Sequence, residues 1–158
     1  MNGFSKISVV ASSILCMGIS TGASAQGLKE KVIGAWTLND GSETFQDGKK
    51  VTPWVSGNLI LDPNGHFSFF VLGKDRVKGE TDVRIPTGPL VAYYGTYTVN
   101  DAENMLTYKV EHAANPMFDG AVRTQKISFK GDLMTTTGSD VKTPQGTITP
   151  VNEWAKTK

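Results

Sequence analysis

Cysteine and histidine are both scarce in this sequence. Cys16 is the only cysteine, and His66 and His112 are the only histidines. Cys16 lies in an N-terminal segment that we expect to be removed, so the mature chain would have no disulfide and its core must stabilise it unaided. Two separate histidines, with no thiol and no clustered carboxylates, argue against a zinc or transition-metal site. We therefore predict no bound metal.

The chain also lacks an excess of charge of one sign. Lys and Arg number 16 against 15 Asp and Glu, and no basic run occurs. This balance gives no electrostatic reason to expect nucleic acid or an anionic membrane surface as a partner. A glycine loop that would cradle phosphate and a nucleophile-elbow motif are both missing from the sequence. We predict no cofactor.

A long hydrophobic run occurs only near the N-terminus. Lys6 precedes an apolar and small-residue run at 7–19, and Ala23-Ser24-Ala25 has the small-x-small form of a signal-peptidase site. The alternative, a membrane anchor, is disfavoured because the run is shorter than the roughly 20 apolar residues of a spanning helix. We predict a signal peptide at 1–25, export to the periplasm or the medium, and one domain at 26–158, without a membrane span.

The remainder of the chain alternates apolar and polar residues in short runs, a pattern that is typical of β-strands. One short helical turn is expected at 28–32. Strands are expected at 33–39, 43–45, 57–61, 66–72, 91–99, 104–112, 121–129, 133–137 and 147–155.

Turn residues join most of these strands at hairpin spacing. Asp40-Gly41, Asp47-Gly48 and Asp62-Pro63-Asn64-Gly65 are examples. A meander of eight or nine strands hides its edges by closing, so the sequence predicts an all-β, antiparallel up-and-down barrel. An interior of this size is either filled by side chains or holds one small ligand. The polar segment 73–89 is expected to be a long loop, a flap over one barrel end.

The stretch 106–129 carries the candidate binding site. On strand 104–112 the apolar face continues into His112, and on strand 121–129 it continues into Gln125 and Arg123. We therefore expect these three side chains to point into the barrel near one end. A buried guanidinium needs a partner, and its donors suit a carboxylate or carbonyl. His112 could add a hydrogen bond or move a proton.

Two structural alternatives compete with this interpretation. The polar side chains could lie at a rim that is open to water, or Arg123 could pair with a carboxylate such as Glu153 or Asp119. Aromatic residues could line the same pocket, but such residues often only fill a core. The aromatic candidates are Tyr93, Tyr97, Tyr108, Trp36 and Phe69.

These residues, taken in order, resemble a known family. The chain is similar, from about residue 28 to 156, to the bacterial and fungal lipocalin-like domain family of small β-barrels. The resemblance implies a ligand-sized barrel with His112 and Arg123 at recurring polar positions, and it implies no known reaction. Its carriers are Gly34-Ala35-Trp36, the hairpin from Gly57-Asn58-Leu59 to His66, Tyr94-Gly95-Thr96-Tyr97, His112, Pro116, Gly120, Arg123, Gly131-Asp132-Leu133 and Trp154.

Three functions are consistent with this sequence. The first is an exported barrel that binds a small hydrophobic or amphipathic molecule, with Arg123 and His112 at its polar end and Gln125 and Tyr108 assisting. The second is a cofactor-free isomerase or cyclase in which His112 moves a proton and Arg123 stabilises an oxyanion. The third is a filled barrel with a structural or inhibitory role, acting through the loop 73–89. The sequence identifies no protein partner.

Overall fold

The computed structural model describes residues 27–77 and 87–157. The predicted signal peptide and most of the predicted flap lie outside these residues. The elements, in chain order, are α1 (Leu28–Val32), β1 (Gly34–Phe45), β2 (Lys50–Leu61), β3 (His66–Gly73), β4 (Leu90–Asn100), β5 (Met105–Ala113), the 3-10 turn η1 (Pro116–Phe118), β6 (Val122–Lys130), β7 (Leu133–Gly138), β8 (Val141–Thr143) and β9 (Gly146–Lys156).

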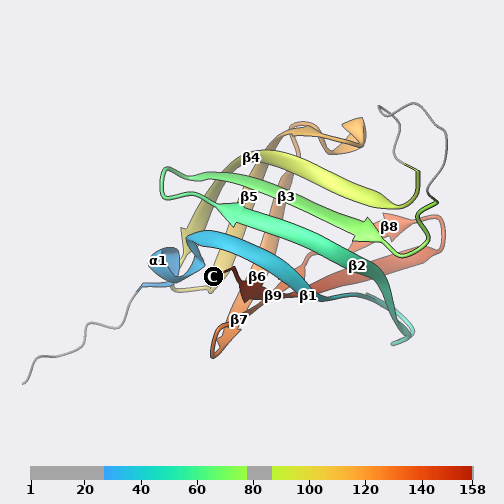
Figure 1. Ribbon diagram of the computed structural model, residues 1–158, viewed down its shortest axis with the longest axis horizontal. Coiled ribbons are helices and arrows are strands. Elements are labelled where there is room, and N and C mark those ends of the chain that lie inside the picture. The colour runs from blue at the N-terminus through green and yellow to red at the C-terminus, as the bar shows by residue number, and fades with distance from the viewer. Residues whose placement is uncertain (1–26, 78–86, 158) are drawn as a thin grey trace, which may run out of the picture.

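The strands form a closed antiparallel barrel, as the alternating sequence predicts (Figure 1). Each of β1 to β6 pairs with the next, β7 pairs with β9, and β9 returns to pair with β1 along most of its length. Closure leaves no long strand edge exposed, which is how such meanders avoid edge-to-edge association. Within the described part of the chain, β8 pairs with β9 alone and is an extra strand beside the ring.

Three features of the predicted strand layout are wrong, and one of them is the start of β2, which lies at Lys50 and not at residue 57. Asp40-Gly41 is not a turn, because β1 continues through it to Phe45 and its register shifts at bulges on both sides. Gly41 lies opposite Trp54, where an added Cβ would approach the Trp54 Cβ to 2.7 Å. The glycine therefore serves close strand packing rather than chain reversal. No strand is expected from the sequence between residues 137 and 147, yet this segment contains β8.

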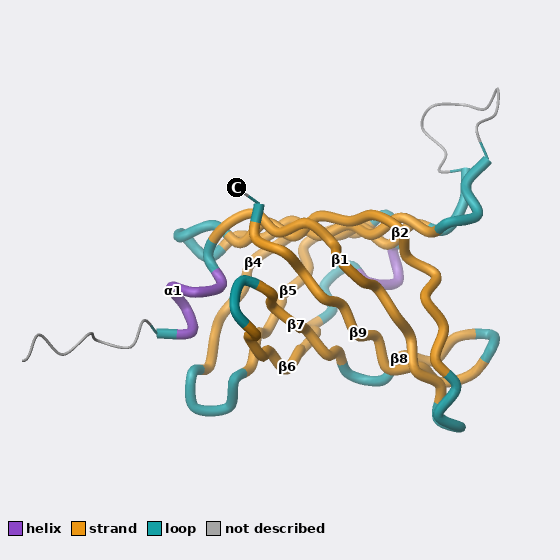
Figure 2. The backbone as a smooth tube through the Cα atoms, turned by 60° about the horizontal axis from the view of Figure 1, so that its bottom comes forward, coloured by secondary structure: helices purple, strands orange, loops and turns teal. Residues whose placement is uncertain are grey.

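The short helix α1 lies at one end of the barrel, and η1 and β8 lie toward the other (Figures 1 and 2). Val32 of α1 is fully buried, and its carbonyl accepts a hydrogen bond of 2.8 Å from Trp36 Nε1. Lys156 Nζ lies 5.2 Å from the centre of the Trp36 ring, a cation–π contact. The helix and this contact cover the α1 end of the barrel.

No helix among residues 27–77 and 87–157 has the length and apolarity to cross a membrane.

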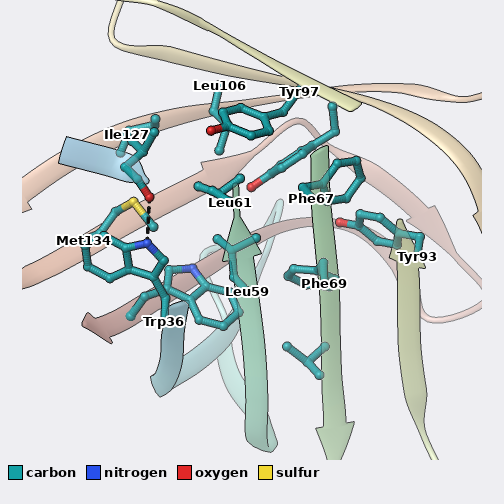
Figure 3. Close-up of a cluster of buried hydrophobic side chains, with 14 of the residues drawn as sticks. Trp36, Leu59, Leu61, Phe67, Phe69, Tyr93, Tyr97, Leu106, Ile127 and Met134 are labelled. Atoms are coloured by element: carbon teal, nitrogen blue, oxygen red, sulfur yellow. Dashed lines mark hydrogen bonds between the residues drawn. The ribbon is translucent and has the colours of Figure 1, made fainter. Parts of the chain in front are cut away.

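Aromatic side chains from neighbouring strands fill the core between the two ends (Figure 3). Phe67 of β3 packs on Tyr108 of β5 with ring centres 4.5 Å apart, and Phe69 stacks on Tyr93 of β4 at 4.7 Å. Alternation along each strand directs these rings inward. The core therefore occupies the α1 half and the middle of the barrel, and the other end is less completely filled.

A bulge in β5 interrupts this alternation. Tyr94 pairs with His112 but the next residue, Gly95, pairs with Val110, so β5 has one more residue than β4 at this point. A Cβ at Gly95 would clash with the carbonyl oxygen of Lys109. Because a bulge reverses which face the following side chains occupy, the predicted register of β5 fails beyond Val110.

Candidate functional site

A cavity of about 330 Å³ occupies the barrel end that carries η1 and β8. Its walls are mainly apolar, and a few polar groups converge on it, which is the usual composition of a small-molecule site. Met117 of η1 is 74 % exposed and lies at its rim, so the cavity communicates with solvent. The polar side chains that line it are Glu43, Arg123, Gln125, Lys142, Thr143, Asn115 and Asn152.

Arg123 is the most unusual of these residues. It lies on β6 beside Tyr108 of β5, and its Nε is buried with no hydrogen-bond partner among residues 27–77 and 87–157. Its guanidinium carbon lies 4.9 Å from the centre of the Phe118 ring and 5.7 Å from that of Tyr93. No carboxylate of the described residues lies within 4.0 Å of the guanidinium. A half-buried cation held between two rings with an unused donor favours an anionic or carbonyl partner.

The structural alternative for Arg123 is not supported by its neighbours. Asp119 Oδ2 lies 3.5 Å from His112 Nδ1, and Glu153 accepts a hydrogen bond from Asn39. Each carboxylate that the sequence offered as a partner therefore contacts another residue. The guanidinium is directed to the cavity wall instead.

Two amides extend the polar surface of the cavity. Gln125 follows Arg123 on the same face of β6, and Asn152 lies on β9. They are only 4 % and 5 % exposed, yet neither side chain hydrogen-bonds to another residue in the described ranges. Amides offer both donors and acceptors, so these two side chains could form hydrogen bonds with a polar group of a ligand.

Tyr93 joins the apolar and polar parts of the wall. Burial raises the pKa of the Tyr93 hydroxyl, and the charge of Arg123 opposes this rise. The phenol therefore stays neutral and can donate or accept a hydrogen bond near the guanidinium. Its ring stacks on Phe69, which also lines the cavity.

Glu43 contributes a carboxyl group from another wall. It lies on β1 in register with Val51 of β2 and Pro150 of β9. Trp54 Nε1 donates a hydrogen bond of 3.1 Å to Glu43 Oε1. Burial raises the pKa of the Glu43 carboxyl, and the Trp54 hydrogen bond lowers it by less. This end of the barrel thus contains the Glu43 carboxyl group, held in place by Trp54, as well as the Arg123 cation.

Four of the eight residues predicted to bind ligand line this cavity: Arg123, Gln125, Tyr93 and Phe69. Three others belong to the packed core instead. Trp36 covers the α1 end, and the Tyr97 hydroxyl donates a hydrogen bond of 2.6 Å to the carbonyl of Asp62. Tyr108 is completely buried and its hydroxyl has no partner. The prediction that these three line the pocket is wrong, because the core fills the barrel up to the level of Tyr93.

The predicted inward orientation of His112 is also wrong. Its side chain is 70 % exposed on the outer face of the barrel, where it contacts Asp119 and lies 5.9 Å from Tyr94, ring centre to ring centre. The β5 bulge opposite Gly95 causes this reversal. His112 instead lines an outer groove of about 250 Å³ with Phe70 and Tyr94. The isomerase or cyclase hypothesis requires His112 and Arg123 at the same substrate. The two side chains do not face the same cavity, so the structure does not support it.

Sequence reasoning missed Glu43, Trp54 and Asn152 as cavity residues. Asp40-Gly41 was interpreted as a turn, which separated Glu43 from the strand that positions it. Trp54 was missed because Pro53 and a register shift between Trp54 and Ser56 interrupt the alternation at the start of β2. A glycine within alternating residues is a known sign of close strand packing or a bulge, and it was the signal available at both Gly41 and Gly95.

Comparisons with known proteins add little to this geometry. No protein-family model matches the chain, and no curated protein sequence matches it. Among solved structures, a redesigned β-barrel is similar with a TM-score of 0.46 and 12 % sequence identity, covering 86 % of this chain and 100 % of the other.

The described residues contain no group of three or more His, Cys, Asp and Glu arranged to hold a metal ion.

Proposed function

We propose that this protein binds a small, largely apolar molecule inside the barrel, with a carboxylate or carbonyl group of the ligand held by Arg123. The observation that carries the proposal is the unpartnered Nε of Arg123 in a mainly apolar cavity. A guanidinium presents its donors in a fixed plane that matches a carboxylate. Lys142 at the rim adds a second positive charge that would attract an anion.

The remaining lining residues support a ligand of this class. Gln125 lies next along the same face of β6 and can bind the second oxygen of a carboxylate. Phe69, Tyr93 and Phe118 offer aromatic surface to the apolar part of the molecule. The cavity is also within the lower range of volumes that hold small ligands, about 300–1,000 Å³. A filled barrel is disfavoured because this space is open.

Isothermal titration with decanoate tests the proposal. Decanoate combines a carboxylate with a flexible apolar chain, so it needs no preset shape. Arg123→Met, which keeps the apolar length of the side chain, should weaken binding about ten-fold or more, since hydrogen bonds to charged groups contribute about 1.5–3 kcal/mol. His112→Ala is the control and should bind like the wild type, because His112 lies on the outer face. Equal affinity of wild type and Arg123→Met would contradict the anchoring role.

Export and family membership stay proposals that rest on the sequence. We infer that the chain is exported after cleavage behind Ala25, and that it is related to the lipocalin-like domain family through the residues given above. N-terminal sequencing of the protein from its own cells checks the first inference. The expected first residue is Gln26. A mature protein that still begins at Met1 would contradict export by this route.

A further inference from the structure

The cavity has chemically different groups on two of its walls. Arg123 lies on β6, and Glu43 lies on β1. Around the closed ring, β7 and β9 separate these strands on one side and β2 to β5 separate them on the other. The two side chains therefore approach the same cavity from well-separated directions. A ligand held at Arg123 and long enough to cross the cavity would meet Glu43 on another wall.

The Glu43 carboxyl is held in place by its neighbours. Trp54 Nε1 binds Oε1 at 3.1 Å, and Trp54 itself packs over Gly41, where only glycine leaves room for it. No hydrogen bond joins Oε2 to another residue of the two described ranges. One carboxyl oxygen is thus fixed by the protein and the other is free to accept a hydrogen bond at the cavity wall.

Apart from Asn152 on β9, the surface between the two groups is mainly apolar. Phe69, Val71 and Val91 line one side, and Ile148 and Pro150 line the other. The Glu43 carboxyl is partly withdrawn from water, and this burial raises its pKa. A poorly solvated acceptor gains most from a donor on the ligand, and it disfavours a ligand end that has none.

We propose that Glu43 is a second anchor that selects amphipathic acids carrying a hydroxyl or another hydrogen-bond donor at the end remote from the carboxylate. This inference rests on the proposed function, because it assumes that Arg123 holds the acid group. It deepens that function by naming the ligand class: ω-hydroxy acids and molecules of similar two-ended polarity.

Titration of the full mature chain with a matched pair of compounds tests the inference. Decanoate and 10-hydroxydecanoate differ only in the terminal hydroxyl. Hydrophobicity alone would favour decanoate, because burying a hydroxyl without a partner is unfavourable. The wild type should instead bind 10-hydroxydecanoate more tightly, by about three- to ten-fold, as expected of one hydrogen bond to a charged or poorly solvated acceptor.

Two variants of Glu43 test whether the preference for the terminal hydroxyl depends on the Glu43 carboxyl group. Glu43→Gln should reduce the preference for the hydroxyl, and Glu43→Leu should reverse it in favour of decanoate. Glu111→Gln removes the same charge on the exposed β5 bulge and should keep the wild-type preference. Either Glu43 variant serves if the other fails to fold.

The outcomes distinguish this inference from the function on which it rests. Decanoate binding that depends on Arg123, with no preference for the hydroxyl in the wild type, would overturn the role of Glu43 alone. An unchanged preference in both Glu43 variants would do the same. Failure of both compounds to bind the wild type would overturn the proposed function, and with it this inference.

Discussion

Two neighbouring tyrosines differ in what their hydroxyl groups are expected to contribute to the stability of the fold. Tyr97 and Tyr108 are partners in the β4–β5 register and both are buried. The Tyr97 hydroxyl donates to the Asp62 carbonyl, whereas the Tyr108 hydroxyl has no partner in the part of the chain that the structure describes. Tyr97→Phe should therefore lower the free energy of unfolding by about 0.5–1.5 kcal/mol. Tyr108→Phe should leave it unchanged or raise it, because it removes an unsatisfied buried group.

Urea unfolding of the two variants measures this difference directly. Each serves as the control of the other, since the same atom is removed from adjacent side chains. An equal loss of stability in both would contradict the hydrogen-bonding assignment.

Glu43 predicts a dependence of stability on pH. Its pKa is raised in the folded protein by burial, so the folded state holds its proton more tightly than the unfolded state. The contribution of Glu43 to stability is then fully present below its unfolded pKa and is lost as the pH rises through the folded pKa. Glu43→Gln cannot ionise, so its stability relative to the wild type should increase from about pH 4 to pH 7. Unfolding free energies of both proteins at the two pH values check this, and a constant difference would count against it.

At the scale of elements, the β5 bulge determines which side chains of β5 face the barrel interior. It directs Val110 inward and His112 outward, and it depends on the absence of a side chain at Gly95. Gly95→Ala should destabilise the fold by about 1–3 kcal/mol, because the added methyl meets backbone atoms that cannot yield without moving a strand. Thr98→Ala, on an exposed position of the same strand, should cost less than about 0.5 kcal/mol. Thermal or urea unfolding of both variants is the measurement, and a Gly95→Ala protein as stable as Thr98→Ala would refute this account of the bulge.

At the scale of the whole molecule, the barrel follows from the sequence because closure needs only alternation and turns. The β6–β7 hairpin is predictable since both strands alternate without interruption between clear turn residues, and the β2–β3 hairpin is predictable only from residue 57 onward, beyond the register shift between Trp54 and Ser56. Arg123 and Gln125 were placed correctly on the cavity side because β6 contains no register shift against its neighbours.

The same reasoning fails where a strand contains an extra residue. A bulge shifts every later side chain to the other face, and alternation counted along one strand cannot detect a residue that is extra only relative to the partner strand. His112, beyond the β5 bulge, was misjudged for this reason, whereas Glu43 was missed because Asp40-Gly41 was interpreted as a turn. Tyr97, Tyr108 and Trp36 do point inward, but how far along the barrel the core is filled depends on packing between all the strands.

We propose that the ligand binds in the cavity beside Arg123 and not in the outer groove beside His112. Chemical-shift mapping by NMR during a decanoate titration tests it most directly, because it reports on both places in one experiment. We predict that the largest shifts occur at Phe69, Tyr93, Arg123 and Gln125, with those of Phe70, Tyr94 and His112 small. Shifts concentrated at Phe70, Tyr94 and His112, with the cavity residues unchanged, would contradict it.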